Sequence, residues 1–288
     1  MAGFDMHVHS TASDGANAPA ALVTMAKEQG LLGMALTDHD TVNGINEAAA
    51  KAKEIDFPLI AGIEFSAEQN EKDVHILGYW FDVAKLANDK QVQEMQAARY
   101  QRCYEIVARL GRLGFDLDAD KIVASAGASG SLGRPHIAMA MVEAGYCVNI
   151  KEAFNKWLGR GMPGYVPRRK LDPIEAIEMI LNAEGIPVLA HPGITGMPDN
   201  FIPVLVRAGL GGIEVYHPDH NFSAVRKYLQ IAHRFRLPAT GGSDFHIQGI
   251  RSLGCRITTV KQLALLAQKR EELVGKRVPD DNIPSSSI

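Results

Sequence analysis

The first residues able to do chemistry are two histidines near the start of the chain, His7 and His9, separated by one apolar residue. In an extended strand alternate side chains leave the same face, so both imidazoles can bind a single ion. A carboxylate, Asp14, follows in a Ser-Asp-Gly turn, and imidazole with carboxylate is a common ligand set for divalent metals. A lone His-x-His pair can be accidental, so its meaning depends on the rest of the chain.

Further histidines and carboxylates recur at the ends of short apolar runs. They are His39 after run 32–36, Glu64 after run 58–63, His75 within run 74–80, His191 after run 187–190, and Asp244 with His246 after run 237–240. If these runs are strands of one βα barrel, the side chains at their carboxyl ends meet at one mouth, where such folds place their active sites. One histidine after a strand is usually structural, but the repeated pattern predicts a shared metal centre.

The size of this set indicates more than one ion. Nine candidate ligands exceed the four of a structural zinc site and the three of a mononuclear catalytic site, so we expect two or three divalent ions. The set contains no thiolate, and its nitrogen and oxygen atoms fit Mn²⁺, Zn²⁺ or Fe, among which the order of affinities does not choose. Three ions carry six positive charges against three negative ones from Asp14, Glu64 and Asp244, leaving roughly +3, which suits a phosphate. Bound metal lowers the pKa of water from ~15.7 toward ~7, so the sequence predicts phosphate-ester hydrolysis by a metal-bridging hydroxide.

The elements that must position these residues alternate along the chain. Amphipathic helices are predicted between the apolar runs, at 18–29, 43–55, 172–184, 200–208 and 223–235. Alternating strands and helices indicate parallel pairing, and about seven strand candidates favour a closed or nearly closed barrel over an open sheet. The fold class expected is therefore α/β, with residues 1–84 and 165–288 forming the catalytic barrel.

Between these two parts the pattern changes. Helices are predicted in succession at 91–114, 118–126, 135–144 and 150–158, with no strand between them. Successive helices do not extend a βα array, so residues 85–164 are interpreted as a helical insertion that caps the substrate. The serine-rich segment 285–287 is expected to be a frayed tail.

Composition excludes several classes of protein. A net charge of −3 in 288 residues gives no basic field for non-specific binding of nucleic acid. The three cysteines have no Cys-x-x-Cys spacing, and no apolar run approaches the ~20 residues of a membrane span. Candidate ligands begin at residue 7, leaving no room for a removable signal peptide. We expect a cytoplasmic protein, without membrane contact or a protein partner, that is a monomer.

Taken together, the polar motifs resemble those of the PHP (polymerase and histidinol phosphatase) family. The resemblance is carried by segments 5–9, 13–15, 37–41, 62–64, 74–78, 190–193 and 242–246. It implies a distorted (β/α)₇ barrel with a trinuclear centre of Mn²⁺, Fe or Zn²⁺. It further implies three ligand groups, which are His7, His9, Glu64 and Asp244; Glu64, His75 and His191; and Asp14, His39 and His246. Asp14, Glu64, Asp244 and His246 would then be the catalytic residues.

The insertion carries a narrower likeness. Segments 133–138 and 142–146 are similar to the bacterial PHP subfamily that acts on nucleotides, including 3′,5′-bisphosphate nucleotide phosphatases and 5′–3′ exoribonucleases. Arg134 offers a planar fork that pairs with phosphate, and Pro135 at a helix start leaves backbone amides free to face an anion. We expect Arg134 and His136 to help hold the phosphate of a nucleotide or short oligonucleotide. A solvated arginine beside a capping proline is the alternative.

Other polar residues leave alternatives open. His217, which follows run 212–216, is either a phosphate ligand or general acid, or a structural residue. His220 and His233 are expected at the surface. Four arginines share one side of the long predicted helix, and since a charged helix face is usually solvated we expect them to face water. They are Arg99, Arg102, Arg109 and Arg112.

The function predicted from the sequence is a metal-dependent phosphoesterase that acts on 5′-AMP or 3′,5′-bisphosphate nucleotides or on the 5′ ends of short RNA. It would be a hydrolase of phosphoric monoesters, with phosphoric diesters as a further substrate class. The same chemistry on another small ester, such as histidinol phosphate, is one alternative. An amide hydrolase is a second, although such enzymes commonly bridge their metals with a modified lysine where Glu64 stands. A non-catalytic metal-dependent binding module is a third.

Overall fold

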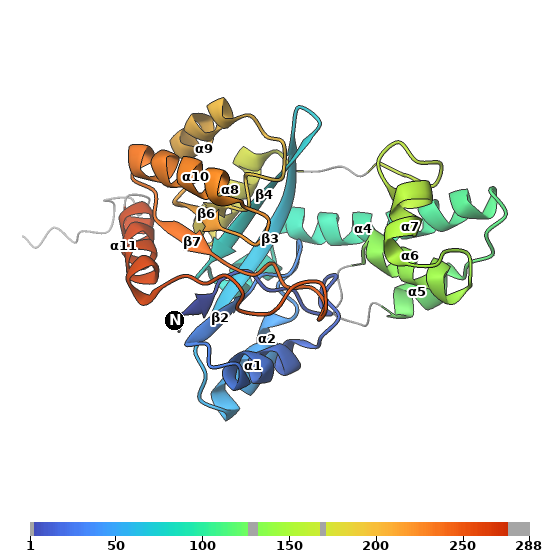
Figure 1. The fold of residues 1–288 in the computed structure, drawn as a ribbon, viewed down its shortest axis with the longest axis horizontal. Coiled ribbons are helices and arrows are strands. Elements are labelled where there is room, and N and C mark those ends of the chain that lie inside the picture. The colour runs from blue at the N-terminus through green and yellow to red at the C-terminus, as the bar shows by residue number, and fades with distance from the viewer. Residues whose placement is uncertain (1–2, 126–131, 168–170, 276–288) are drawn as a thin grey trace, which may run out of the picture.

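The computed structural model, which describes residues 3–125, 132–167 and 171–275, contains a barrel and a helical cap beside it (Figure 1). The seven strands pair in chain order. They are β1 (Phe4–Asp5), β2 (Gly33–Leu36), β3 (Leu59–Gln69), β4 (Lys72–Tyr79), β5 (Ile186–Leu189), β6 (Gly212–Tyr216) and β7 (Ala239–Gly241). Val8 forms a bridge to Phe245, which joins the first and last segments and nearly closes the barrel. The predicted seven-stranded α/β barrel is therefore confirmed.

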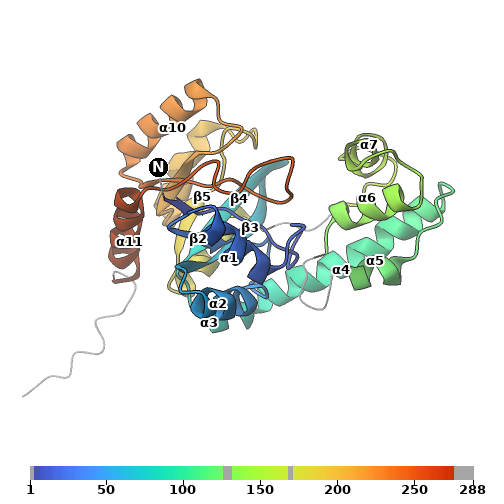
Figure 2. The ribbon, with the colours of Figure 1, turned by 60° about the horizontal axis from the view of Figure 1, so that its bottom comes forward.

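Helices cover the outside of the strands (Figures 1 and 2). They are α1 (Pro19–Glu28), α2 (Ile45–Glu54), α3 (Val83–Ala87), α8 (Pro173–Asn182), α9 (Ile202–Ala208) with the preceding 3₁₀ turn η2 (Asp199–Phe201), α10 (Phe222–Phe235) and α11 (Val260–Gly275). The α8 helix illustrates how the sequence fixes a helix start. The Asp172 carboxylate accepts a hydrogen bond from the Ile174 backbone N–H, and the Glu175 side chain accepts one from the Asp172 N–H. The α11 helix lies outside the elements predicted from the sequence.

One strand runs against the expected direction. The prediction of parallel pairing throughout is wrong for β4, which pairs antiparallel with both β3 and β5. The reason is a two-residue turn in which Asn70 and Glu71 have φ values of 47° and 63°. Positive φ at both central residues is the geometry of a tight hairpin, so no crossover helix separates the two strands. The hairpin lets β4 return at once beside β3 and carries His75 toward the barrel mouth.

Two ligand positions differ slightly from those expected. His7 and His9 do not end a strand, because β1 stops at Asp5 and the histidines follow it. Glu64 does not end β3 but lies within it, since β3 continues through the hairpin to Gln69. The β-bridge between His39 and Glu64 brings the segment after β2 beside this part of β3. The shifts leave all of these residues near the same mouth.

The cap consists of α4 (Lys90–Gly111), α5 (Ala119–Ser125), α6 (Arg134–Glu143), α7 (Ile150–Ala153) and the π-helical turn η1 (Phe154–Leu158). It has an apolar core of its own, centred on side chains such as Ile106, Leu110 and Met141. The first turn of α4 instead packs into the barrel core through Val92. A single long helix therefore reaches from the barrel into the cap, as both views show (Figures 1 and 2).

Among the described residues, no helix is both long enough and apolar enough to cross a lipid bilayer. The predicted serine-rich tail at 285–287 lies outside the described residues.

Candidate metal centre

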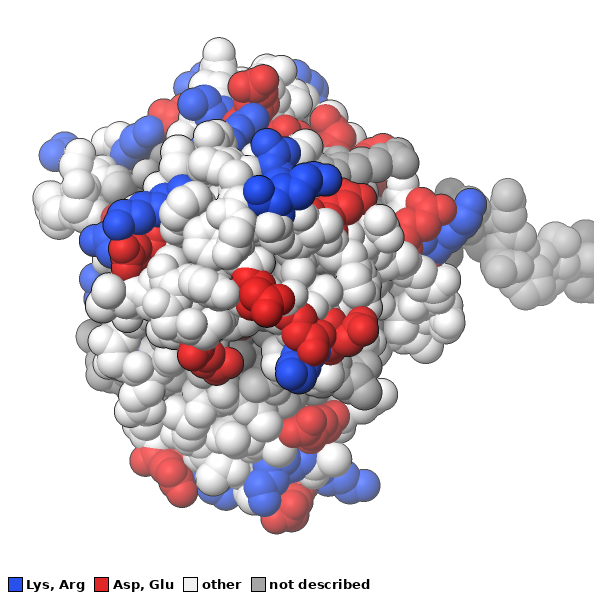
Figure 3. All heavy atoms as spheres, turned by 90° about the vertical axis from the view of Figure 1, so that its right-hand side faces the viewer, with Lys and Arg blue, Asp and Glu red and all other residues white. Residues whose placement is uncertain are grey.

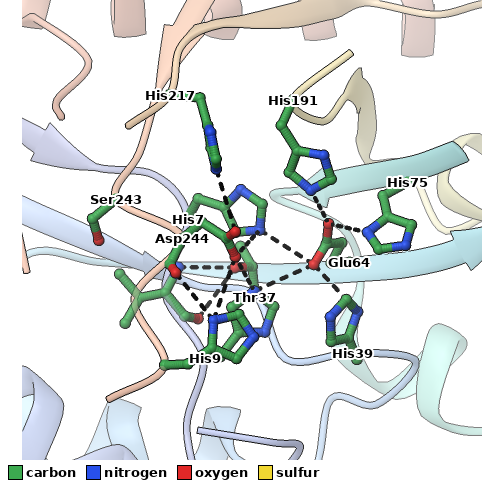
Figure 4. A network of polar contacts seen from close by, with 12 residues as sticks. His7, His9, Thr37, His39, Glu64, His75, His191, His217, Ser243 and Asp244 are labelled. Carbon is green, nitrogen blue, oxygen red and sulfur yellow. Dashed lines mark hydrogen bonds and ion pairs between the residues drawn. The ribbon is translucent and has the colours of Figure 1, made fainter. Parts of the chain in front are cut away.

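Glu64 stands at the middle of a cluster of imidazoles at the barrel mouth (Figure 4). Its Oε2 atom lies 3.2 Å from His7 Nε2 and 3.2 Å from His9 Nε2. Asp244 Oδ1 closes the group from the loop after β7, at 3.5 Å from His7 Nε2 and 3.3 Å from His9 Nε2. One ligand atom from each of these four buried residues lies within 4.8 Å of the others. They form the first potential ion site.

The other carboxylate oxygen of Glu64 faces a second group. Its Oε1 atom lies 2.8 Å from His75 Nδ1 and 3.0 Å from His191 Nε2 (Figure 4). His39 Nδ1 lies 3.2 Å from Oε2, the oxygen that also faces His7 and His9. His39, Glu64 and His75 each offer a ligand atom within 4.8 Å of the others, so they form a second potential ion site. Glu64 is thus placed to bridge two ions, because each oxygen faces a different set of imidazoles.

A third group surrounds Asp14. Its Oδ1 atom lies 3.3 Å from His246 Nε2 and 3.8 Å from His9 Nδ1, and its Oδ2 atom lies 4.0 Å from His39 Nε2. These four residues also offer ligand atoms within 4.8 Å of one another. The structure therefore brings all nine sequence-predicted ligands together at one mouth.

The unsatisfied polar atoms of the cluster fit a metal. Among the described residues, His7 Nε2, both ring nitrogens of His9 and Glu64 Oε2 are buried and make no hydrogen bond of acceptable geometry. Buried polar atoms are rarely left without a partner, so this concentration requires an explanation. An ion ~2.1 Å from each ligand sets neighbouring ligand atoms about 3.0–3.4 Å apart at octahedral or tetrahedral angles. The distances around Glu64 and Asp244 range from 2.8 to 3.5 Å, and most of them fall within this interval.

Protonation of the metal-free cluster follows from its charges. Burial lowers the pKa of His39 to about 3, which leaves its ring neutral and able to bind metal. Burial also works against charge on His9, but Asp244 and Glu64 outweigh it and raise the pKa of His9 to about 10. Burial would raise the pKa of Asp244, yet the charge of His7 and the hydrogen bond from His217 lower it well below its usual value. The carboxylates are therefore ionised and ready to bind cations.

A carboxylate that the sequence analysis did not single out orients two of the histidines. Glu214, on β6 and 1% exposed, lies with Oε1 3.0 Å from His7 Nδ1 and accepts the His191 backbone N–H at Oε2 over 2.8 Å. A carboxylate behind an imidazole fixes the ring so that its other nitrogen faces the metal. The signal was present in the sequence, as a single acid within the apolar run 212–216.

His217 orients Asp244 from behind. Its Nδ1 accepts a hydrogen bond from the Asp219 backbone N–H, so in the neutral ring Nε2 carries the proton and donates to Asp244 Oδ2 over 3.3 Å. The side chain is fully buried, and Arg251 holds the same Asp244 oxygen from the solvent side. Between the roles left open by the sequence, this arrangement favours a positioning residue over a phosphate ligand.

His220 is not a surface residue, contrary to expectation. It is 4% exposed, its Nδ1 donates to the Val215 carbonyl over 2.8 Å, and its Nε2 accepts the Gly193 backbone N–H over 3.0 Å. The glycine permits this close approach, since a Cβ at position 193 would lie 2.7 Å from the imidazole ring. The histidine thus supports the loop that follows His191. His233 is exposed, as expected.

The arginines of α4 do not all face water. Arg99 forms an ion pair with the buried Asp40, and Arg102 donates from Nε to the Val166 carbonyl over 2.8 Å. The expectation of a solvated face is wrong for these two, because the helix lies against the barrel mouth where it enters the cap. Arg109 and Arg112 lie further along the helix and are exposed.

Together with two more arginines, Arg99 and Arg102 line a small cavity next to the ligands. The cavity has a volume of about 230 Å³, and we name it the arginine pocket. Its lining residues are Asp14, His39, Ser66, Asp73, His75, Arg99, Arg102, Gly133, Arg134, Pro135, Arg160 and Tyr165. Four guanidinium groups beside a metal-ligand cluster provide a site for an anion.

The structure separates the two cap residues predicted to hold phosphate. The Arg134 guanidinium donates to the Leu158 carbonyl over 3.1 Å and lies 5.5 Å from the Phe154 ring centroid, in the arginine pocket. His136 Nδ1 accepts the Gly133 backbone N–H over 3.2 Å, and its ring lines a different cavity on the other side of Pro135. Arg134 is thus placed to meet an anion in the arginine pocket, whereas His136 lines the other cavity.

Comparison with known proteins also identifies relatives that act on phosphate esters. The sequence profile of the PHP domain matches residues 5–156. A 3′,5′-nucleoside bisphosphate phosphatase from Chromobacterium violaceum is 33% identical over 86% of this chain and 89% of its own. A 5′–3′ exoribonuclease from Haemophilus influenzae is 35% identical over 84% of this chain and 89% of its own. The crystal structure of a protein from Bifidobacterium adolescentis described as a metal-dependent phosphoesterase superposes with a TM-score of 0.87, at 32% identity over 93% of this chain and 96% of that one.

Proposed function

The chain belongs to the PHP family, and from this premise we propose that it is a metal-dependent phosphoesterase that hydrolyses nucleotides carrying two phosphate groups. The observation that carries the proposal is the position of the arginine pocket, which shares Asp14, His39 and His75 with the ligand cluster. A substrate with one phosphate at the ligand cluster and a second in the arginine pocket would occupy both sites.

The nine clustered residues are proposed as the metal ligands, with Mn²⁺ as the first candidate and Fe or Zn²⁺ as alternatives. Bound divalent ions supply hydroxide at neutral pH and offset the charge of the phosphate oxygens. Glu64 would be shared between ions, because its two oxygens face different imidazoles, while Glu214 and His217 hold His7 and Asp244 in orientation. Asp14 and His246 are proposed to lie against the substrate, because Asp14 lines both cavities beside the cluster and His246 lines one of them.

The arginine pocket has the chemistry of a second phosphate site. Its cationic side chains face one cavity, and Arg134 is held in place by the rings of Phe154 and Tyr165 at 5.5 and 5.7 Å. A planar guanidinium fixed in this way can donate two parallel hydrogen bonds to one phosphate. The four arginines outnumber the two carboxylates of the lining, Asp14 and Asp73, so the pocket carries a net positive charge that a monophosphate at the cluster would leave in place. This charge supports a substrate with two phosphates.

The names of the relatives point to the same substrate class. A nucleoside 3′,5′-bisphosphate and the 5′ end of an RNA strand have one element in common, which is a terminal nucleotide whose 3′ oxygen carries phosphorus. We propose that the phosphate at the 3′ oxygen reacts at the ligand cluster and that the 5′-phosphate occupies the arginine pocket. Short RNA is thereby the second candidate substrate.

The outer surface of the cap supports binding of a nucleotide or a strand end over binding along a long strand. Among the described residues on the face shown in Figure 3, acidic and basic side chains are interspersed, and wide areas carry neither. Proteins that follow a nucleic-acid backbone present a continuous basic groove. Here four arginines, Arg99, Arg102, Arg134 and Arg160, instead line the arginine pocket.

A substrate panel tests the proposal. Purified protein in saturating Mn²⁺ is given adenosine 3′,5′-bisphosphate, 5′-AMP, a 5′-phosphorylated RNA trinucleotide and histidinol phosphate, and kcat/KM is measured for release of phosphate or nucleotide. We expect the bisphosphate to exceed 5′-AMP by at least roughly tenfold, as befits a second charge-assisted contact. Equal rates for the bisphosphate and histidinol phosphate would contradict the proposal.

A further inference from the structure

A second cavity lies on the other side of the ligand cluster and has a different character. Its volume is about 440 Å³, within the ~300–1,000 Å³ of small-molecule pockets. Apolar side chains form most of its walls, with Ile122, Met139 and Ile150 from the cap and Ile247 from the barrel. We name it the apolar pocket. Met139 is 39% exposed, so a large apolar side chain is accessible to a ligand at this position.

Several polar side chains also line the apolar pocket and could orient a flat ligand. The imidazoles of His136 and His246 line this cavity, and although the His246 ring is stacked on His9 at 4.1 Å between centroids, imidazoles are groups on which an aromatic ligand can stack. Lys121 and Glu143, both exposed, stand at the rim and supply one donor and one acceptor. Apolar walls with a few polar groups are the usual make-up of a site for an aromatic heterocycle.

The position of the apolar pocket relates it to the reaction. It shares Asp14 and Pro135 with the arginine pocket, so the two cavities meet at these residues. Asp14 and His246 belong to the third ligand group of the cluster. A ligand with a phosphate at the cluster can therefore extend one way into the cationic cavity and the other way into the apolar cavity.

We infer that the apolar pocket binds the nucleobase of the substrate, between the cap helices α5 and α6 and the barrel loop that carries Ile247. The inference rests on the proposed function and deepens it, since it adds the base to the two phosphates. The base lies against Met139 and Ile247, and the sugar spans the junction at Asp14. Glu143 and Lys121 are at the rim, where they can contact polar edges of the base.

The test compares two substrates that differ only in the base. One is adenosine 3′,5′-bisphosphate, and the other is its abasic analogue, in which hydrogen replaces adenine. In Mn²⁺, wild-type protein is expected to prefer the nucleotide by roughly tenfold or more in kcat/KM, the size of a stacking contact to one base. Met139→Ala and Ile247→Ala, one from each wall, should each reduce this preference by roughly fivefold. Leu113→Ala, an exposed apolar residue of the cap outside both pockets, is the matched control and should leave the preference unchanged.

The outcomes separate the two proposals. Equal kcat/KM for nucleotide and abasic analogue, or equal losses on both substrates in Met139→Ala and Ile247→Ala, would overturn the base assignment while the phosphoesterase proposal stands. Release of phosphate from neither substrate would overturn the proposed function and the base assignment with it. Thermal unfolding of each variant shows that a changed preference is measured on folded protein.

Discussion

The barrel mouth and the cap are built in opposite ways. At the mouth, the residues that contact Glu64 come from the segments after β1, β2 and β5 and from β4, and they are buried or nearly so. In the cap, a core separate from the barrel supports Arg134 and Met139, which face open cavities. The difference fits the function proposed above, in which the barrel would determine the reaction and the cap would determine the substrate.

The largest loss of turnover should follow from removing one of the proposed metal ligands at the barrel mouth. His39→Ala removes an imidazole that faces both Glu64 and Asp14, so turnover in saturating Mn²⁺ should fall roughly a thousandfold or more. The fold should survive, since the side chain is partly exposed at the mouth. The measurement is kcat together with thermal unfolding, with His233→Ala on the exposed face of α10 as control. A metal-saturated His39→Ala protein with near-normal turnover would refute the role of the cluster.

A smaller loss of activity is expected when a residue that contacts a metal ligand, and not the metal itself, is changed. Glu214→Gln keeps the shape of the side chain but removes the charge that faces His7 Nδ1, and it should lower metal affinity by about 10–100-fold. Excess metal should restore much of the activity, which distinguishes a positioning residue from one that contacts substrate. Titration of Mn²⁺ against activity measures both. An activity loss that no concentration of metal reverses would argue for a different role.

A substitution in the cap should change binding and leave chemistry largely intact. Arg134→Ala removes a fixed guanidinium from the arginine pocket, so KM for a 3′,5′-bisphosphate should rise by about 10–30-fold. The value for kcat should change much less, because Arg134 lies outside the ligand cluster. Steady-state kinetics give both parameters, and Arg234→Ala on the exposed part of α10 controls for lost charge. If kcat alone falls, the division between mouth and cap is wrong.

The mildest test varies pH. The metal-free ring of His9, with a pKa raised to about 10 by Asp244 and Glu64 against the effect of burial, holds a proton at neutral pH. Metal must displace that proton, so affinity should increase with pH, by about tenfold per pH unit for each proton released, until pH approaches 10. Calorimetry of Mn²⁺ binding between pH 6 and 8, in buffers of different ionisation enthalpy, measures the release. Affinity that stays constant with pH would contradict the protonation of the cluster.

Much of the mouth was predictable because its polar residues lie in or directly after strongly apolar runs. Polar side chains such as His39 and His191 follow such runs at once, and a barrel leaves few places for them except its mouth. The direction of β4 was not predictable from its run of residues, since periodicity reports the two faces of a strand and not its direction. The two-residue turn at Asn70 decided that direction.

The cap was less predictable, because its contacts join residues far apart in sequence. A helix face with several arginines is compatible with water or with a partner, and the ion pair of Arg99 with Asp40 spans 59 positions. His220 was misjudged for the same reason, since its burial depends on Gly193 and Tyr228 from other segments. Local patterns give the elements, whereas the partners of charged side chains depend on how those elements pack.

The central claim is that the clustered imidazoles and carboxylates hold two or three divalent ions. Anomalous diffraction at the manganese absorption edge, on crystals grown with Mn²⁺, tests it most directly. The account predicts two or three peaks at the barrel mouth, one between His7, His9 and Asp244 and another on the opposite side of Glu64. Diffraction maps without a peak at this mouth, from protein saturated with Mn²⁺, would contradict it.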